Sequence, residues 1–294
     1  MDILSERPRL LGLAYRLLGS LSDAEDVVQE AYGRWYALTD PGRAAIESPG
    51  AWLTTVASRI CLDLLGSARA RRERYVGSWL PEPVPDEAGL TDPADRVALD
   101  ETVTMAFLVV LESMTPAERV AFVLHDVFGY PFAEVADVLG RSPAAARQLA
   151  SSARRRVPSA PAPRDRSADV VRAFKRAWAA NDIEGLVGLL DPDATATADG
   201  GGLVSTAPEP ITGAARIARY AVEITQLVPA MDIEERLVNG APGLVAVRDG
   251  VVITVMAFDV VGDVIRNVWA VRNPEKLRAW VTSPSRRRPA ARHP

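Results

Sequence analysis

Residues 131–157 read PFAEVADVLGRSPAAARQLASSARRRV and contain the signals of two short helices. Apolar residues spaced three and four apart begin at Phe132 and define one face of the first helix. Gly140 then offers a helix end, and Ser142 with Pro143 offers an N-cap followed by proline at the first helical position. Because so few residues join them, the two helices must cross steeply, which predicts a helix-turn-helix.

The second of these helices carries basic and polar side chains on a surface without acids. No Asp or Glu occurs between Arg141 and Arg156. Such a helix fits a phosphate-lined groove of DNA, in which Arg and Gln can also contact base edges. The alternative is a solvent-exposed basic face on a core helix. We predict that DNA is contacted by Arg147, Gln148, Ser151, Arg154 and Arg155.

The composition is typical of a globular protein with several domains. The chain has 294 residues, of which 48 % are hydrophobic and 24 % charged, and this length allows two or three small domains. The net charge of −4 does not by itself indicate a nucleic-acid binder, so the argument for DNA rests on local arginine clusters. No apolar run approaches the ~20 residues of a membrane span and no signal peptide is recognisable, so we expect a cytoplasmic protein.

The sequence offers few residues for metal or acid–base chemistry. Cys61 is the single cysteine, and His125 and His293 are the only histidines. We therefore expect no disulfide, no metal site, no cofactor and no catalytic residue.

A helix with an acidic solvent side is predicted near the start of the chain. An apolar helical stripe ends at Gly19, and Ser22 with Glu25 forms a capping box that starts a helix over residues 22–38. The helix dipole explains acids in the first turn only. The residues alone leave open whether this side is a docking surface or a solvated face. Its members are Asp23, Asp26, Gln29 and Glu30.

A loop and a long helix follow. Residues 39–50 contain turn-forming residues without a regular pattern, and a helix is predicted over residues 51–74. Its polar side and basic end are formed by Arg59, Asp63, Ser67, Arg69, Arg71 and Arg72.

Three segments, in this order, resemble the extracytoplasmic-function group of sigma-70-type RNA polymerase sigma factors. They are LLGLAYRLLGSLSDAEDVVQEAYGRW at 10–35, AWLTTVASRICLDLL at 51–65, and the helix-turn-helix. The resemblance implies that the acidic side of the helix over residues 22–38 docks on the β′ clamp helices of core RNA polymerase. It also implies that residues 39–50 and the helix after them open the −10 promoter element, and that the helix-turn-helix reads the −35 element beside the polymerase β flap.

The second half of the chain follows a proline-rich linker, PSAPAPRDR, at residues 158–166. Helices are predicted over 170–190 and 211–227, and β-branched runs broken by glycines follow between residues 231 and 271. Helices before an antiparallel meander predict an α+β layer structure. This pattern resembles the cone-shaped SnoaL-like and nuclear-transport-factor-like (NTF2-like) domains.

Three short stretches resemble signatures of the sigma-factor branch that carries a fused SnoaL-like domain. This resemblance implies that the domain regulates the sigma domains in place of a separate anti-sigma protein. That branch commonly has a basic residue after DGGG, where this chain has Leu203. The predicted regulatory interface comprises WLPEP (Trp79, Leu80, Pro81, Glu82, Pro83), DGGG (Asp199, Gly200, Gly201, Gly202) and NPEKL (Asn273, Pro274, Glu275, Lys276, Leu277).

The predicted fold is multidomain, with two all-α sigma domains before an α+β SnoaL/NTF2-like domain. The predicted function is that of a monomeric sigma factor for bacterial core RNA polymerase and promoter DNA, regulated by its own C-terminal domain. The alternatives are a helix-turn-helix regulator with a ligand-binding domain, and a sigma-like protein fused to an isomerase or cyclase. The predicted segments are 1–76 (region 2), 77–93 (acidic linker), 94–157 (region 4), 158–166 (linker), 167–282 (SnoaL-like domain) and 283–294 (disordered tail).

Overall fold

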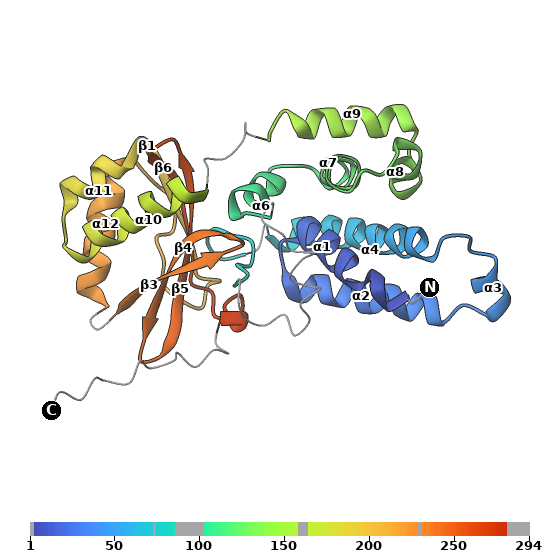
Figure 1. Cartoon of the computed structure of the whole chain (residues 1–294), viewed down its shortest axis with the longest axis horizontal. Coiled ribbons are helices and arrows are strands. Elements are labelled where there is room, and N and C mark those ends of the chain that lie inside the picture. Colours follow the sequence, from blue (N-terminus) through green and yellow to red (C-terminus); the bar gives the residue numbers. More distant parts are fainter. Residues whose placement is uncertain (1–2, 73–74, 86–102, 158–163, 229–230, 281–294) are drawn as a thin grey trace.

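The chain folds into two all-α units followed by an α+β unit (Figure 1). The structure, a computed structural model, describes residues 3–72, 75–85, 103–157, 164–228 and 231–280, without the side chains of residues 68–72 and 164–165. Within these residues, no helix is long and apolar enough to cross a membrane. The predicted fold class, helical domains before an α+β domain, is confirmed.

Three long helices and one short helix form the first unit. The apolar sides of α1, α2 and α4 pack against one another. In chain order the elements are the 3-10 turn η1 (Ile3–Glu6), α1 (Arg7–Leu18), α2 (Leu21–Tyr36), α3 (Asp40–Ala44) and α4 (Pro49–Arg72).

Two local predictions in this unit are wrong. Helix α2 begins at Leu21 with Ser20 as its N-cap, rather than at a capping box formed by Ser22. A carboxylate from the linker, described below, accepts a hydrogen bond from the Leu21 N–H and so fixes the earlier start. Residues 39–50 are not all loop, because the Thr39 side chain caps the short helix α3.

The second unit contains the predicted helix-turn-helix. Gly140 ends α8 in the left-handed conformation, with φ of 62°, and the Ser142 side chain caps α9. The sequence signals at these two positions are therefore confirmed. The elements are α6 (Met105–Glu112), α7 (Pro116–Phe122), the π-helical turn η2 (Val123–Val127), α8 (Phe132–Leu139) and α9 (Pro143–Arg154).

The two helical units share one hydrophobic core. Buried leucines from both, among them Leu53 and Leu124, belong to a single cluster. Beside it, the buried Arg119 donates from Nη1 to the Leu17 carbonyl at 2.8 Å and pairs with the Glu112 carboxylate at 2.7 Å. The second unit is thus fastened to the C-terminal end of α1.

The third unit is a six-stranded sheet with helices on one face. The strand order is β2-β1-β6-β5-β4-β3. The elements are α10 (Arg164–Ala179), α11 (Ile183–Leu189), β1 (Leu190–Asp199), β2 (Ile211–Thr212), α12 (Ala214–Leu227), β3 (Asp232–Val238), β4 (Ala241–Arg248), β5 (Val251–Val261), β6 (Val264–Val271) and the 3-10 turn η3 (Arg278–Trp280).

The prediction of an antiparallel meander is correct for β3 to β6 but misses β1. This strand pairs parallel to β6 and antiparallel to β2. Its sequence contains Pro192 between two aspartates, which have low strand propensity. The strand forms because a neighbour far along the chain supplies its hydrogen bonds.

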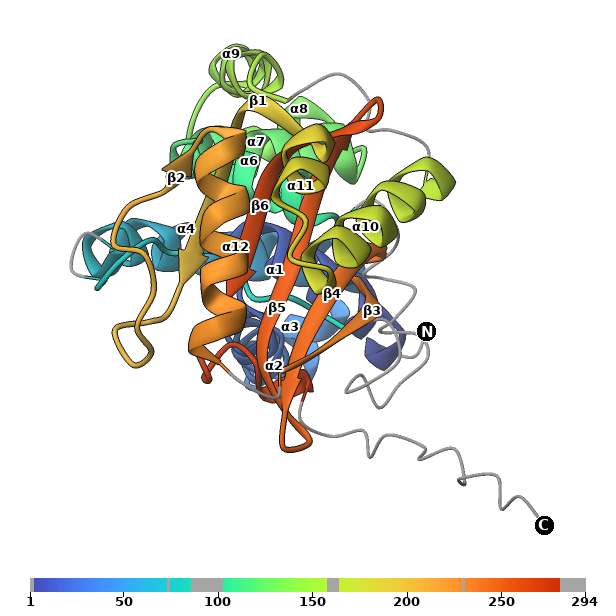
Figure 2. The ribbon, with the colours of Figure 1, turned by 90° about the vertical axis from the view of Figure 1, so that its left-hand side faces the viewer.

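The sheet is covered on both faces (Figure 2). Helices α10, α11 and α12 pack on one face around Phe174, Trp178 and Phe258. The other face faces the helical units, and there Leu80 and Met105 join Trp269 and Trp280 in a separate cluster. The linker at Leu80 is therefore part of a core.

Candidate functional site

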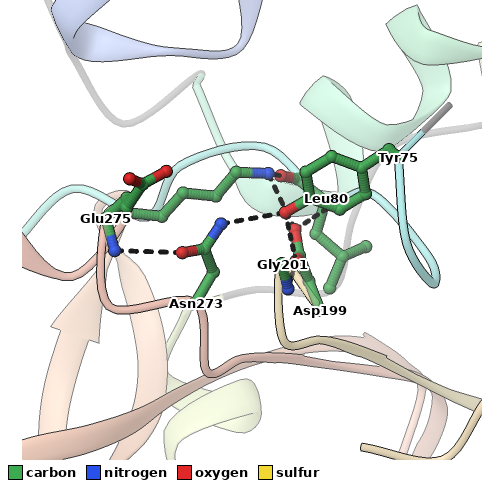
Figure 3. Close-up of polar contacts among 7 residues, drawn as sticks. Tyr75, Leu80, Asp199, Gly201, Asn273 and Glu275 are labelled. Carbon is green, nitrogen blue, oxygen red and sulfur yellow. Dashed lines mark hydrogen bonds and ion pairs between the residues drawn. The ribbon is translucent and has the colours of Figure 1, made fainter. Parts of the chain in front are cut away.

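The three stretches of the predicted regulatory interface meet where the sheet faces the linker. At their centre lies Asp199, at the end of β1, whose side chain is completely buried. Its carboxylate accepts hydrogen bonds from the Tyr75 hydroxyl at 2.7 Å, the Leu80 N–H at 2.9 Å and the Gly201 N–H at 3.0 Å (Figure 3). Lys276 Nζ is the fourth donor, at 2.7 Å. One carboxylate thus joins the linker to two loops of the sheet domain.

The glycines after Asp199 are required by close approaches. A Cβ atom on Gly200 would lie 2.1 Å from the Val204 carbonyl oxygen, which belongs to the backbone. At Gly201, where φ is 64°, a Cβ would lie 2.4 Å from Asn273 Nδ2. The DGGG stretch therefore forms a turn tight enough to bring Asp199 against the linker and Asn273.

Lys276 supplies the positive charge of this site. Its Nζ pairs with Asp199, donates to the Leu80 carbonyl, and lies 4.1 Å from the ring centroid of Trp79. Leu203, which occupies the position after DGGG, is 63 % exposed and contributes no charge. The cation that faces Asp199 therefore comes from NPEKL.

A second polar cluster, centred on Glu82, joins the linker to α1 and α2. The Glu82 carboxylate accepts from the Leu21 N–H at 2.8 Å, and the Tyr15 hydroxyl donates to the Glu82 carbonyl at 2.6 Å. Asn239 Nδ2 donates to the Tyr15 oxygen at 2.7 Å. Nearby, Trp280 Nε1 donates to the carbonyl of Pro83 at 2.8 Å.

Burial controls the protonation of this cluster. Desolvation raises the pKa of the Tyr15 hydroxyl, which remains a neutral group that donates one hydrogen bond. Desolvation also raises the pKa of the Glu82 carboxyl, although hydrogen bonds from the backbone of Leu21 and Ser22 oppose this effect. Around Asp199, burial and the neighbouring carboxylate raise the pKa of the Tyr75 hydroxyl.

Sequence reasoning missed Tyr15, Tyr75, Asn239 and Trp280. Tyr15 lies within an apolar helical stripe, so the pattern predicts only a buried core residue. Asn239 precedes Gly240, and this pair is typical of a hairpin turn, which identifies the turn but not its partner. Their contacts join segments that are far apart in the sequence.

The residues predicted to contact DNA lie on two different helices. Four lie on α9 and Arg155 is the C-cap residue that follows it, and all five are exposed. Arg147 lies over the Phe132 ring, and Arg154 pairs with Asp126. On α4, Arg59 is exposed and donates to the Asp137 carbonyl in α8, and Asp63 is exposed. Ser67 is also exposed, and the side chains of Arg69, Arg71 and Arg72 lie outside the described residues.

The predicted polymerase-docking residues form one exposed side of α2. Asp23, Asp26, Gln29 and Glu30 are exposed, whereas Ala24 and Val27 face the core. Glu30 pairs with Arg34 one turn later, at 2.5 Å, in a solvent-exposed position. Such exposed pairs contribute little to stability.

Within the second unit, Glu118 ties α7 to the end of α9. Its carboxylate accepts from the Thr115 N–H at 2.9 Å, from Ser152 Oγ at 2.7 Å and from Arg156 Nη1 at 2.7 Å. Desolvation would raise the pKa of the Glu118 carboxyl, but the hydrogen bonds from Arg156, Thr115 and Ser152 outweigh it and lower the pKa from 4.5 to about 2.

Replacing Glu118 with glutamine is expected to lower the free energy of unfolding by about 1–3 kcal/mol at pH 7, because a charged acceptor is lost. Since the pKa is lower in the folded state, this stabilisation is present above pH 4.5 and is lost as the pH falls towards about 2. Urea unfolding measured across this pH range should show that the free energies of unfolding of the variant and the parent become more similar as the pH falls. The control, Glu134→Gln at an exposed position of α8, should show no such trend. A difference that stays constant with pH would contradict the role of the carboxylate.

An exposed basic helix-turn-helix, packed on a helical unit with an exposed acidic side, is the arrangement expected of a sigma-70-type transcription initiation protein. Residues 3–71 match the family model for sigma-70 region 2, and residues 104–157 match the model for sigma-70 region 4. The chain is 41 % identical over 97 % of its length to the ECF RNA polymerase sigma factor SigJ of Mycobacterium tuberculosis, of which it covers 95 %. The chain therefore belongs to the extracytoplasmic-function (ECF) family of sigma-70 factors.

Other similarities agree with this assignment. The crystal structure of SigJ from Mycobacterium tuberculosis superposes with a TM-score of 0.75, covering 92 % of this chain and 95 % of that chain at 41 % identity. The probable ECF RNA polymerase sigma factor SigI of the same species is 40 % identical over 64 % of this chain and 65 % of its own length.

Proposed function

We propose that this protein binds bacterial core RNA polymerase through the acidic side of α2 and directs transcription initiation at specific promoters, acting as a monomer in the cytoplasm. The observation that carries the proposal is the simultaneous exposure of two surfaces. Asp23, Asp26, Gln29 and Glu30 are available to the β′ clamp helices, and the basic side of α9 is available to the −35 element. The middle of α4, with Arg59 and Asp63, is assigned to the −10 element.

We further propose that the C-terminal domain regulates this activity by holding the linker. The −10 and −35 elements lie tens of ångströms apart on B-DNA, at 3.4 Å per base pair. Two units that share one core cannot reach both elements at once, so promoter binding requires them to separate. The Asp199 and Glu82 clusters fix the linker whose extension would permit that separation. Because the domain is tethered, even weak contacts act at an effective concentration in the millimolar range.

The hydrogen bonds made by two acids of the sheet domain, Asp199 and Asp259, favour a regulatory role over catalysis. Asp199, the buried acid of the sheet domain, has its oxygens occupied by linker and loop donors. Asp259 accepts from Asn267 at 2.9 Å on another part of the sheet. Among the described residues, these two acids therefore do not converge on one catalytic position.

Run-off transcription with core polymerase tests the proposal directly. The full chain is compared with a chain that ends at Ala162, on a broad pool of promoters. We expect initiation that depends on the added protein, and a changed amount or promoter preference after truncation. Absence of initiation with both chains, together with retained DNA binding, would favour a conventional helix-turn-helix regulator. Equal initiation by both would contradict the regulatory role of the C-terminal domain.

A further inference from the structure

The turn between β3 and β4 holds the linker at Val84 through Asn239. This residue is only 5 % exposed and adopts a left-handed conformation with φ of 51°. Its N–H donates to the Val84 carbonyl at 2.9 Å, and its Oδ1 accepts from the Val84 N–H at 3.2 Å. Pro85 and Val238 form an isolated antiparallel bridge beside it. The turn therefore binds the linker as a short additional strand would.

The contacts continue from Asn239 into the first helical unit. Asn239 Nδ2 donates to the Tyr15 oxygen, and the single hydroxyl proton of Tyr15 is given to the Glu82 carbonyl. Tyr15 is fully buried, so water does not replace either bond. The Glu82 N–H is held by the carbonyl of Gly19 at 2.8 Å. Both backbone groups of Glu82 are thus bound at α1, and this positions its side chain.

Glu82 acts at the first turn of α2. Leu21 is the first residue of that helix, and its N–H has no partner within the helix. The Glu82 carboxylate accepts from this N–H and places negative charge at the positive end of the helix dipole. The ordinary N-cap, Ser20, accepts from the Asp23 N–H in this turn, at 3.3 Å, and not from the Leu21 N–H. The first turn, which carries Asp23 and leads to Asp26, therefore depends on the linker.

We propose that Asn239 is a positioning residue for the polymerase-docking helix, and that docking of the C-terminal domain and binding of core polymerase at α2 are coupled through Tyr15 and Glu82. The inference rests on the proposed docking role of α2. Coupling between two binding events is reciprocal, so polymerase bound at α2 strengthens the hold of Asn239 on the linker by the same factor. The domain therefore supports docking while it restrains the linker.

The test uses Asn239→Gly in the full chain. Glycine accepts the left-handed conformation and keeps the backbone bond to Val84, so only the side-chain bonds are lost. The matched control is Asp249→Gly in the next hairpin, where φ is 53° and the residue is exposed. Hydrogen exchange of the Leu21 amide and the Kd for core polymerase are measured for each. We expect two- to about tenfold faster exchange and two- to about tenfold weaker binding for Asn239→Gly, the size of one hydrogen bond, because only the Nδ2 bond leads to Tyr15. We expect no change for the control.

Tyr15→Phe tests the same contacts from the other side, because it removes only the hydroxyl. If the contacts act in series, Tyr15→Phe and Asn239→Gly together should have hardly more effect on Leu21 exchange than either alone. Unchanged exchange in both variants would overturn the inference. Faster exchange of the Leu21 amide in these variants, with unchanged affinity for polymerase, would also overturn the inference, provided that the Asp26→Lys, Glu30→Lys double variant does weaken binding. If that charge reversal has no effect either, the docking role of α2 is wrong and the inference falls with it.

Discussion

Replacing Asp199 with alanine is expected to lower the free energy of unfolding by about 3–5 kcal/mol, the usual cost of breaking a buried ion pair from one side. The variant leaves the Lys276 ammonium without its carboxylate and the N–H groups of Leu80 and Gly201 without their acceptor. Because these donors come from the linker and from the sheet domain, the variant weakens the contact between the linker and that domain. Urea unfolding followed by tryptophan fluorescence measures it, since Trp79 and Trp280 lie at this contact.

The control for this change is Asp263→Ala in the turn between β5 and β6. Asp263 is exposed and pairs with the exposed Arg166 at 3.5 Å, so an effect below about 0.5 kcal/mol is expected. Lys276→Ala and the double variant complete a cycle. The double variant should lose less than the sum of the single variants, because each charge is the other's partner. Additive losses, or equal effects of Asp199→Ala and Asp263→Ala, would contradict the central role of the Asp199 cluster.

Reversing the charge of Asp26 and Glu30 to lysine together is expected to raise the Kd for core polymerase by at least about tenfold. If this face of α2 meets a basic surface, reversal replaces attraction with repulsion, which slows association and costs several kcal/mol where charges meet directly. Both side chains point to solvent, so the fold should be unaffected, and the exposed pair between Glu30 and Arg34 adds little. Binding is measured at two salt concentrations, and the loss should be smaller at the higher one.

Glu184→Lys with Glu223→Lys is the matched control for this prediction. These exposed acids lie on α11 and α12 of the sheet domain, and their reversal changes the net charge by the same amount. The control should bind polymerase as the parent does. An equal loss in both variants would mean a non-specific charge effect. Full binding by the α2 variant, with an unchanged unfolding curve, would refute docking at this face.

Local signals made the helix-turn-helix predictable. Gly140 and Ser142 determine a helix end and a helix start through bonds to their immediate neighbours, and both are seen in the structure. The start of α2 was not predictable in the same way. A carboxylate 61 residues further along the chain supplies the bond that moves the start from the Ser22 capping box to Leu21.

In the candidate site, too, some residues could be predicted from the sequence and others depend on distant partners. The resemblance picked out WLPEP, DGGG and NPEKL, and the structure brings all three together at Asp199. No local signal in the sequence identifies the partners of Tyr15, Tyr75 and Asn239, because each of these partners lies in another domain. The parallel strand β1 was missed for this reason too, since its strand conformation depends on β6 rather than on its own residues.

Alternating prolines restrict how the linker can align with its partners. Pro81, Pro83 and Pro85 have no N–H, so the donors left in this stretch belong to Leu80, Glu82 and Val84. Each is bound by a different acceptor: the Asp199 carboxylate, the Gly19 carbonyl and the Asn239 side chain. A slip of one residue would set a proline ring nitrogen against all three acceptors in one direction (Pro81, Pro83 and Pro85) and against two of the three in the other (Pro81 and Pro83). The linker therefore has no bound state, shifted by one residue, that keeps all three of these hydrogen bonds.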